Sequence, residues 1–353
     1  MAAIFQVHLA SPIGYICDTA DRQSSSQAQP ASPPNENLIE LAVSLNSSLH
    51  RTQGGRQGMT RMFRPNGNAG RIAAQPHSPG RPGGLPPQSY RDRHRALAEI
   101  AARRTLSANE RQRMCQMIAE QVLSRSSAMR SVNFTSTSTA DLTTMADLYD
   151  QHFFDGHCLA IARHHGMHFR WSKRMTSNGG KTVRVTGRDP RTGEQFVRYE
   201  IVLSATLLFQ TFSDLHRPIR VTGVMCNNRI QAMQRILEHE LVHLVEMLVW
   251  GDSCCAAARF QSIAGRLFGH TEHKHDLITQ QERAERKFNI RVGSLVEFAF
   301  EGKRCVGTVN RITRRATVLV PDPKGQLYDD GHRYAKYYIP LSHLRPISRQ
   351  GRS

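Results

Sequence analysis

The sequence lacks both an apolar run long enough to cross a membrane and the Cys-x-x-Cys pairs that zinc ribbons require. Its N-terminus also lacks the basic segment and the uninterrupted apolar stretch of a secretory signal peptide. The seven cysteines are odd in number and scattered, which is typical of a reducing compartment. These absences predict a cytoplasmic protein without a membrane partner.

Acidic residues are also scarce. The chain of 353 residues carries 29 Asp and Glu against 47 Lys and Arg, so its formal net charge is +18. Such an excess favours polyanionic partners, above all DNA or RNA, because protein cations release counterions from the phosphate backbone. Part of the excess lies in residues 51–95, but the segment after residue 291 is basic as well. We therefore predict contact with nucleic acid through the N-terminal tail and the C-terminal part of the chain.

The first 140 residues divide into two parts. Residues 1–88 are rich in Ser, Gln, Pro, Gly and Asn, and such a composition cannot bury enough apolar surface to fold. We predict a disordered tail here, with a short helix near residues 38–49. Residues 89–140 are predicted to form a helical segment and a linker, since Ser107 and Glu110 make a capping box. The apolar stripe that follows indicates packing, and it consists of Met114, Met117, Ile118 and Val122.

Residues 141–285 have the composition of a globular α+β domain. The patterning predicts a helix at 142–154, strands at 169–173, 182–186, 199–204 and 217–222, and two further helices at 229–250 and 255–268. Between the first two strands, the segment Ser177-Asn-Gly-Gly180 predicts a hairpin-type turn. The expected architecture is therefore a set of helices packed on a small sheet.

Apolar and polar residues alternate from about residue 290 onward. Short strands are predicted at 292–300, 305–312, 316–321 and 337–340, with turns at Lys324-Gly325 and Asp330-Gly331. This pattern predicts a small all-β barrel of SH3-like or Tudor-like type over residues 290–348. Two of its segments, which begin at Arg311 and Arg333, combine basic and aromatic residues. Surfaces of this composition can contact the phosphate backbone of a nucleic acid and stack on its bases. The alternative interpretation is a solvated barrel face.

The most informative motif is His239-Glu-Leu-Val-His243, which lies inside a long amphipathic segment. Histidines four residues apart lie on one face of a helix, where their ring nitrogens can bind a single Zn²⁺. Glu240, between them, can serve as general base on a zinc-bound water. Asn228 can cap this helix and Gly251 can end it. The alternative is a chance pattern on a surface helix, and the regular apolar spacing argues against it.

Several segments, in the same order, resemble the SprT-like (Spartan-type) metalloprotease family over about residues 144–285. They are Leu148-Tyr-Asp-Gln-His-Phe-Phe-Asp-Gly156, Trp171-Ser-Lys-Arg-Met-Thr-Ser-Asn-Gly-Gly180, Tyr199-Glu-Ile-Val-Leu-Ser204 and the His-Glu-Leu-Val-His motif. The resemblance implies a zincin-like fold and zinc-dependent cleavage of peptide bonds. The best-known members cut proteins that are crosslinked to DNA, with DNA-binding elements beside the protease domain. The resemblance therefore implies that this chain acts on a protein substrate associated with nucleic acid.

The third zinc ligand is where the chain departs from that family. The family places a histidine four residues before an aromatic residue at the start of the second helix. If Phe260 is that aromatic residue, Ala256 occupies the histidine position, and alanine cannot bind zinc. Cys255 can supply a thiolate instead, whereas His270 and His275 follow a helix about 20 Å long. We expect His270 to be the third ligand, with Cys255 and His275 as alternatives.

The leading hypothesis is a zinc-dependent endopeptidase in which Glu240 transfers the proton and His239, His243 and His270 hold the metal. Hydrogen bonds to the other ring nitrogens are expected to fix the helical histidines, and Glu246 is expected to support them or to lie at the surface. One alternative is a nucleic-acid- or ribosome-associated binding protein that retains a zincin fold without activity. Another is a zinc hydrolase that acts on a substrate other than protein.

Overall fold

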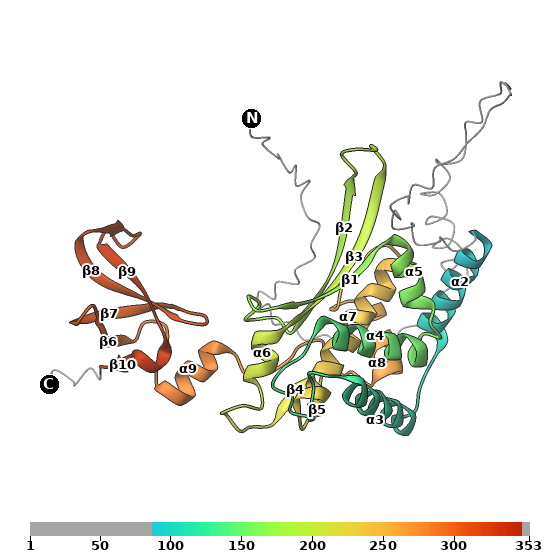
Figure 1. The fold of residues 1–353 in the computed structure, drawn as a ribbon, viewed down its shortest axis with the longest axis horizontal. Helices are drawn as coiled ribbons and strands as arrows, with labels where there is room; N and C mark the ends of the chain where they lie inside the picture. Colours follow the sequence, from blue (N-terminus) through green and yellow to red (C-terminus); the bar gives the residue numbers. More distant parts are fainter. Residues whose placement is uncertain (1–86, 348–353) are drawn as a thin grey trace, which may run out of the picture.

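The structure is a computed structural model, and it describes residues 87–347 (Figure 1). Within this range the protein is mixed α+β, as predicted. No helix of the described range is long and apolar enough to cross a membrane. The tail was predicted to be disordered over residues 1–88, with a short helix near 38–49. Residues 1–86 of it lie outside the described residues.

Two helices precede the predicted globular domain, namely α2 (Pro87–Arg103) and α3 (Ala108–Arg125). The predicted capping box is confirmed, because Ser107 accepts a hydrogen bond from the Glu110 backbone N–H and the Glu110 carboxylate accepts one from Ser107 at 2.7 Å. The predicted packing role of the apolar stripe is also confirmed, because Ile118 is fully buried. Both helices contribute to the same hydrophobic core as the elements that follow, so they belong to the globular unit.

Two helices and a three-stranded sheet come next along the chain. They are α4 (Thr139–Phe153), α5 (His157–His165), β1 (Met167–Ser172), β2 (Gly180–Arg188) and β3 (Gln195–Ser204). The strand order is β1-β3-β2, with β1 parallel to β3 and β2 antiparallel to it. The sheet therefore places β2 at an edge.

The hairpin-type turn predicted at residues 177–180 is wrong. β1 and β2 are not neighbours in the sheet, so the segment between them crosses to the far edge instead of folding back. The hairpin is formed by β2 and β3, and its turn is closed by a hydrogen bond from Asp189 N–H to the Glu194 carbonyl at 2.8 Å. Glycine-rich turn chemistry indicates a local bend, but it does not determine which strands pair.

The remaining elements of this unit surround one long helix. They are α6 (Ala205–Gln210), β4 (Ile219–Val221), β5 (Val224–Cys226), α7 (Arg229–Val249) and α8 (Ala258–Phe268). Asn228 caps α7 as predicted, since its side chain accepts a hydrogen bond from the Gln231 N–H. α8 begins at Ala258, three residues later than predicted, so the residues before it form a loop.

The start of α7 is anchored by a buried arginine. Arg229 is 4% exposed, and its guanidinium donates hydrogen bonds at 3.0–3.1 Å to the carbonyl oxygens of Asn133, Leu208, Phe209 and Thr211. These carbonyls belong to the segments before α4 and around the end of α6. Because α7 also packs against β2 and β3, it has a fixed position relative to the sheet.

The C-terminal unit is a small antiparallel sheet with its own core. Its elements are α9 (Gln280–Phe288), β6 (Leu295–Phe300), β7 (Lys303–Ile312), β8 (Ala316–Leu327), β9 (Arg333–Ile339), the 3₁₀ helix η2 (Leu341–His343) and β10 (Arg345–Pro346). The strand order is β10-β6-β7-β8-β9. The turn predicted at Lys324-Gly325 is wrong, because these residues lie within β8, at a shift in its register with β9.

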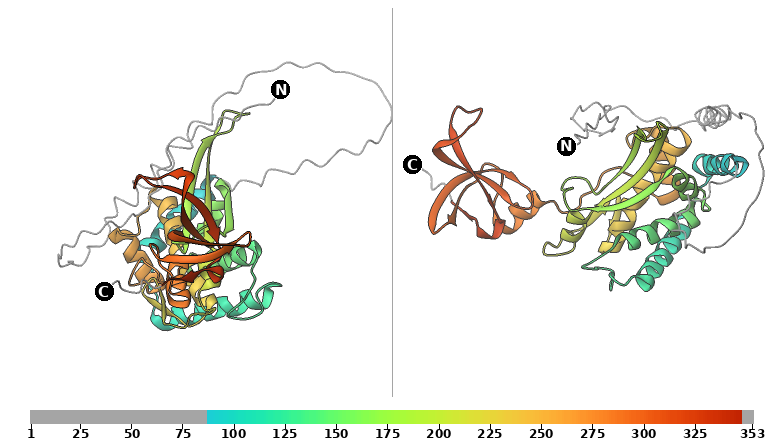
Figure 2. Two further views of the ribbon diagram at one scale, coloured as in Figure 1. Left: turned by 90° about the vertical axis from the view of Figure 1, so that its left-hand side faces the viewer. Right: turned by 45° about the horizontal axis from the view of Figure 1, so that its top comes forward.

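Helix α9 connects the two units (Figure 2). Its residues Arg283 and Lys287 form salt bridges with Asp214 at 2.7 and 2.6 Å, and Glu282 pairs with Arg217 at 2.6 Å. These bridges join α9 to the larger unit. Its Ala284 is fully buried in the separate core of the C-terminal sheet. One short helix therefore contacts both units.

Candidate metal centre

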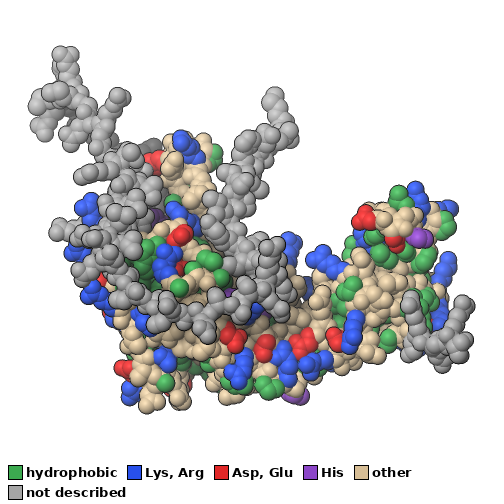
Figure 3. Space-filling view, turned by 180° about the vertical axis from the view of Figure 1, so that it is seen from behind, with side chains coloured by type: hydrophobic (Ala, Val, Ile, Leu, Met, Phe, Trp, Pro, Cys, Tyr) green, Lys and Arg blue, Asp and Glu red, His purple; other side chains and the backbone are tan. Residues whose placement is uncertain are grey.

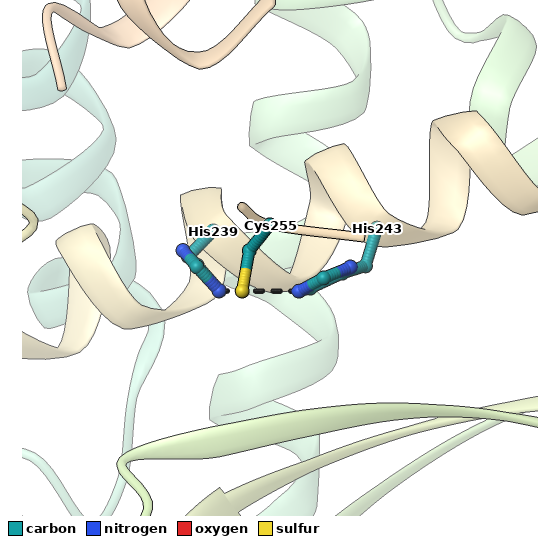
Figure 4. Close-up of side chains that lie close together, drawn as sticks. All are labelled: His239, His243 and Cys255. Carbon is teal, nitrogen blue, oxygen red and sulfur yellow. Dashed lines mark hydrogen bonds between the residues drawn. The ribbon is translucent and has the colours of Figure 1, made fainter. Parts of the chain in front are cut away.

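The two motif histidines lie together on α7, and one cysteine joins them (Figure 4). The Nε2 atoms of His239 and His243 are 3.2 Å apart. The Sγ atom of Cys255 comes from the loop before α8, and the three ligand atoms all lie within 4.8 Å of one another. Within residues 87–347 this is the one group of three such side chains close enough to hold a metal ion.

The local sequence explains why these side chains converge. His239 and His243 are one helical turn apart, so their rings lie on the same face of α7, where they meet edge to face. The Phe260 ring of α8 lies against both, with centroid distances of 4.8 Å to His239 and 4.5 Å to His243. Because α8 packs on α7 through this ring, the loop that carries Cys255 is held over the histidine pair.

The chemistry of this donor set fits zinc. Two imidazole nitrogens and a thiol sulfur are ligands that Zn²⁺ prefers, and three protein ligands are typical of catalytic zinc sites. With Zn–N bonds of about 2.0–2.1 Å in tetrahedral geometry, two nitrogens are expected roughly 3.3 Å apart. The observed separation of 3.2 Å is close to this value.

A chain of buried hydrogen bonds fixes the ring of His243. Its Nδ1 is 2.7 Å from the Ser253 hydroxyl, which donates its proton to Glu246 at 2.5 Å. Since that hydroxyl proton is used, His243 Nδ1 must donate to Ser253, and this tautomer leaves Nε2 free to bind a metal. Glu246 is fully buried and also accepts from Arg259 at 2.6 Å. Glu246 therefore supports the site, as one of the two interpretations of the sequence predicted.

Both histidines are neutral near pH 7. Burial lowers the pKa of His243 to about 4 and holds the pKa of His239 well below its usual range, where the other nearby imidazoles add to the effect. Neutral imidazole is the form that binds a metal. The Nδ1 of His239 is buried and has no hydrogen-bond partner among the described residues, so the support predicted for both rings is found for His243 alone.

Glu240 lies beside the histidine pair, where its carboxylate faces strand β2. The Thr182 hydroxyl is 2.8 Å from Oε2 of Glu240 and 2.9 Å from its backbone oxygen. A Cβ atom on Gly180 would lie 2.6 Å from Oε1, so only glycine leaves room for the carboxylate at this position. Burial raises the pKa of Glu240 to about 8, and the Thr182 hydrogen bond opposes this shift. Thr182 and Gly180 thus set both the position and the basicity of the carboxylate.

The expectation that His270 joins the histidine pair is corrected by the structure. Its Nε2 is 2.9 Å from the Glu238 carboxylate, which also accepts a hydrogen bond from Tyr149 at 2.6 Å and pairs with Arg235 at 2.5 Å. This buried network holds the His270 ring outside the ligand group, which within residues 87–347 consists of His239, His243 and Cys255. The ring of His275 lies instead against the chain at Gly179, outside the ligand group. Cys255, the other alternative, is the residue that the fold brings to the pair.

Three residues of the site, Thr182, Gly180 and Ser253, were not identified from the sequence. Thr182 and Gly180 are ordinary members of a strand, and their approach to Glu240 depends on β2 lying at the sheet edge next to α7. Ser253 lies in a loop, and its role depends on the fold of residues 250–257. One signal was available, since Gly180 belongs to a Gly-Gly pair that follows a strand and thus marks a close approach.

Comparisons of this chain with protein-family models, with curated proteins and with solved structures found no match. The assignment of a function therefore depends on the residues of the site and on their geometry.

Proposed function

We propose that this protein is a zinc-dependent endopeptidase. The observation that carries the proposal is the placement of the buried Glu240 carboxylate, held by Thr182, next to the cluster of His239, His243 and Cys255. A group of metal ligands with an adjacent general base is what zinc-dependent hydrolysis of an amide requires. The ligand atoms, the base and the residues that orient them come from different elements, so the arrangement depends on the whole fold.

The side chains have distinct roles in this proposal. A Zn²⁺ held by His239, His243 and Cys255 supplies Lewis acidity. The Glu240 carboxylate takes a proton from the attacking water and passes it to the leaving amine. Burial raises its pKa, so the ionised carboxylate binds a proton more readily than an exposed one does. Thr182 keeps the carboxylate in its rotamer while the proton moves.

The finer fold assignments are part of the same proposal. We infer a zincin-like unit of the SprT-like type from the long helix with His239 and His243, the edge strand β2 beside it and the motif order along the chain. We infer an SH3-like barrel from the five short antiparallel strands around a separate core. Cys255, in place of the family's histidine at position 256, then makes the site a variant with a mixed nitrogen and sulfur ligand set.

The outer face of the C-terminal sheet supports contact with nucleic acid. Tyr338 is 60% exposed and lies opposite Thr317, which in turn lies opposite Arg311, so Tyr338 and Arg311 share one face. Lys336, two residues before Tyr338, projects from the same face. An exposed aromatic ring flanked by cations can stack on bases while the cations contact phosphates. We therefore propose that the protein substrates are associated with nucleic acid.

The test is hydrolysis of an unfolded protein, such as casein, by the full chain with one equivalent of zinc and after removal of the metal by a chelator. We expect cleavage with zinc, loss of cleavage after chelation and recovery when zinc is restored. A chain that binds zinc but never cleaves would contradict the proposal and favour the non-catalytic binding protein. Cleavage that is indifferent to chelation would exclude the metal centre as the active site.

A further inference from the structure

We propose that the projecting β2–β3 ribbon is a DNA-binding arm that enters the major groove of duplex DNA beside the metal centre. The arm is defined as residues 184–198. The inference follows from three features of these residues, namely their two-stranded geometry, their unpaired arginines and their position relative to Glu240.

The arm is a ribbon of two strands only. β1 pairs with β3 from Tyr199 to Ser204, whereas the β2–β3 pairing continues to Arg188 and Gln195. Residues 195–198 of β3 therefore have a neighbour on one side alone, and the ribbon extends beyond the body of the protein (Figure 1). An isolated two-stranded ribbon has little hydrophobic core to stabilise it. Contact with a partner therefore explains the length of the ribbon better than packing within the protein does.

The arm is rich in arginines that form no salt bridge within residues 87–347. It carries Arg184, Arg188, Arg191 and Arg198, and none of these forms a salt bridge with any residue between 87 and 347. The space-filling view shows basic side chains at the projecting end (Figure 3). In contrast, several buried or half-buried arginines of the unit, such as Arg217 and Arg235, are paired with carboxylates. The unpaired set is available for phosphates, which arginine recognises well.

The Asp189 side chain and the Glu194 backbone shape the turn of the arm. Asp189 accepts hydrogen bonds from the backbone N–H groups of Arg191 at 2.8 Å and Thr192 at 3.3 Å, and these bonds hold its pKa below the usual range. The backbone N–H of Glu194 is bonded to the Thr192 hydroxyl at 3.3 Å. The turn thus has a defined shape, and it presents Arg191 at the tip of the ribbon.

The geometry favours duplex DNA over duplex RNA. The major groove of B-form DNA is about 12 Å wide and admits a two-stranded ribbon, whereas the A-form groove of RNA is deep and too narrow for side chains to read. Val185 is 43% exposed and lies directly opposite Arg198, whose guanidinium lies 4.5 Å from the centroid of the Phe196 ring. On this face, Val185 offers an apolar contact that suits the methyl group of thymine. Arg198 offers a cation whose motion is restricted by the Phe196 ring.

The part of β2 that precedes the arm passes the metal centre. β2 begins at Gly180, which is in contact with Glu240, and Arg184 donates a hydrogen bond to the Gly251 carbonyl after the end of α7 at 3.1 Å. DNA held on the arm would therefore bring attached proteins next to the cluster. This last step rests on the proposed peptidase function, whereas DNA binding by the arm does not.

The test is the affinity of the full chain for a short fluorescent DNA duplex, measured by anisotropy over a series of salt concentrations. The arm variant is Arg188→Gln with Arg191→Gln. Loss of two phosphate contacts should weaken binding roughly ten- to a hundredfold at ~0.1 M salt and lower the slope of log K against log salt by about two. The matched control is Arg91→Gln with Arg95→Gln, which removes the same charge from exposed positions of α2, and we expect it to change the affinity much less.

Three outcomes would overturn the proposal. Unchanged affinity in the arm variant would show that the arm does not touch DNA. Equal losses in the arm and control variants would show that only net charge matters. Equal binding of an RNA duplex, with the same dependence on the arm, would rule out the groove geometry. Because the assay needs no hydrolysis, it separates failure of the arm from failure of the peptidase function, and unfolding curves of both variants confirm that the ribbon still folds.

Discussion

Replacement of Glu240 by glutamine should reduce peptide hydrolysis by at least a hundredfold and up to about ten-thousandfold, while zinc binding stays unchanged. The substitution removes the proton acceptor but keeps the shape of the side chain. Thr182 can still donate its hydrogen bond, which is 2.8 Å long in the parent protein, to the amide oxygen. Because the amide has nearly the same size and can keep the Thr182 hydrogen bond, the free energy of unfolding should not fall. Turnover of casein, zinc content and thermal unfolding, measured on the same preparations, test the three parts.

The matched control is Glu200→Gln, which neutralises a carboxylate of the same sheet that pairs with Arg170 at 2.7 Å, away from the cluster. We expect this variant to cleave at nearly the parent rate. If Glu240→Gln also cleaves at that rate, Glu240 is not the base. If it loses its zinc, the carboxylate has a structural role that the arrangement of the site does not predict.

A second substitution tests the same carboxylate by moving it rather than changing it. A methyl group at Gly180 would lie 2.6 Å from Oε1 of Glu240, so Gly180→Ala must displace the carboxylate. A shift of about 1 Å at a catalytic group can cost on the order of a hundredfold in rate. Gly265→Ala in α8 is the control, since its nearest contact is an ordinary 3.5 Å to the His270 carbonyl. Activity that survives in Gly180→Ala would place the reacting proton elsewhere.

Loss of any one of the three ligands should weaken zinc binding by at least a hundredfold. Removal of an outer hydrogen-bond partner alone costs about ten- to a hundredfold in metal affinity, and removal of a direct ligand costs more. The variants are His239→Ala, His243→Ala and Cys255→Ser, and competition with a chromogenic chelator measures their affinities. Ser253→Ala should show an intermediate loss, because it removes no ligand but breaks the 2.7 Å contact that orients His243 and the hydrogen bond from Ser253 to Glu246.

The control for this series is His270→Gln, which can keep a hydrogen bond to the buried Glu238 and thereby avoids an unpaired charge. We expect its zinc affinity to equal that of the parent protein. The ligand set predicted from the sequence, His239, His243 and His270, would be supported by full zinc binding in Cys255→Ser together with loss of zinc binding in His270→Gln. That result would also require the His270 ring to leave the network with Glu238 and Tyr149.

The part of the site that lies on one helix could be predicted from the sequence. The spacing of His239 and His243 predicts that their side chains lie together, because residues four apart share a helix face. The capped helix was confirmed with its start at Arg229. Glu240 needed no further information, since its position between the two histidines places it beside them.

The third ligand could not be predicted, because its position depends on where a loop ends and a helix begins. The sequence pattern extends the second helix back to residue 255, whereas α8 starts at Ala258. Those residues form a loop, from which the Cys255 thiol reaches His239 and His243 on α7. The three histidines after α8 gave a stronger pattern, but burial next to Glu238 accounts for His270.

The sheet shows a similar limit. All three of its strands were predicted at nearly the right residues, yet the pairing was wrong, because the pattern of one strand does not name its neighbour. The position of β2 at the edge is what brings Thr182 and Gly180 to Glu240. Residues that reach Glu240 through strand pairing therefore cannot be predicted from local sequence patterns. Two histidines on one helix can be.

The most direct test of the metal centre is zinc-edge X-ray absorption of the full chain loaded with one equivalent of zinc. The ligand set of His239, His243 and Cys255 predicts one sulfur at about 2.3 Å and two imidazole nitrogens at about 2.0–2.1 Å. Cys255→Ser should remove the sulfur shell and leave the nitrogen shell. A parent spectrum with nitrogen and oxygen neighbours only, or a chain that binds no zinc at all, would contradict the account.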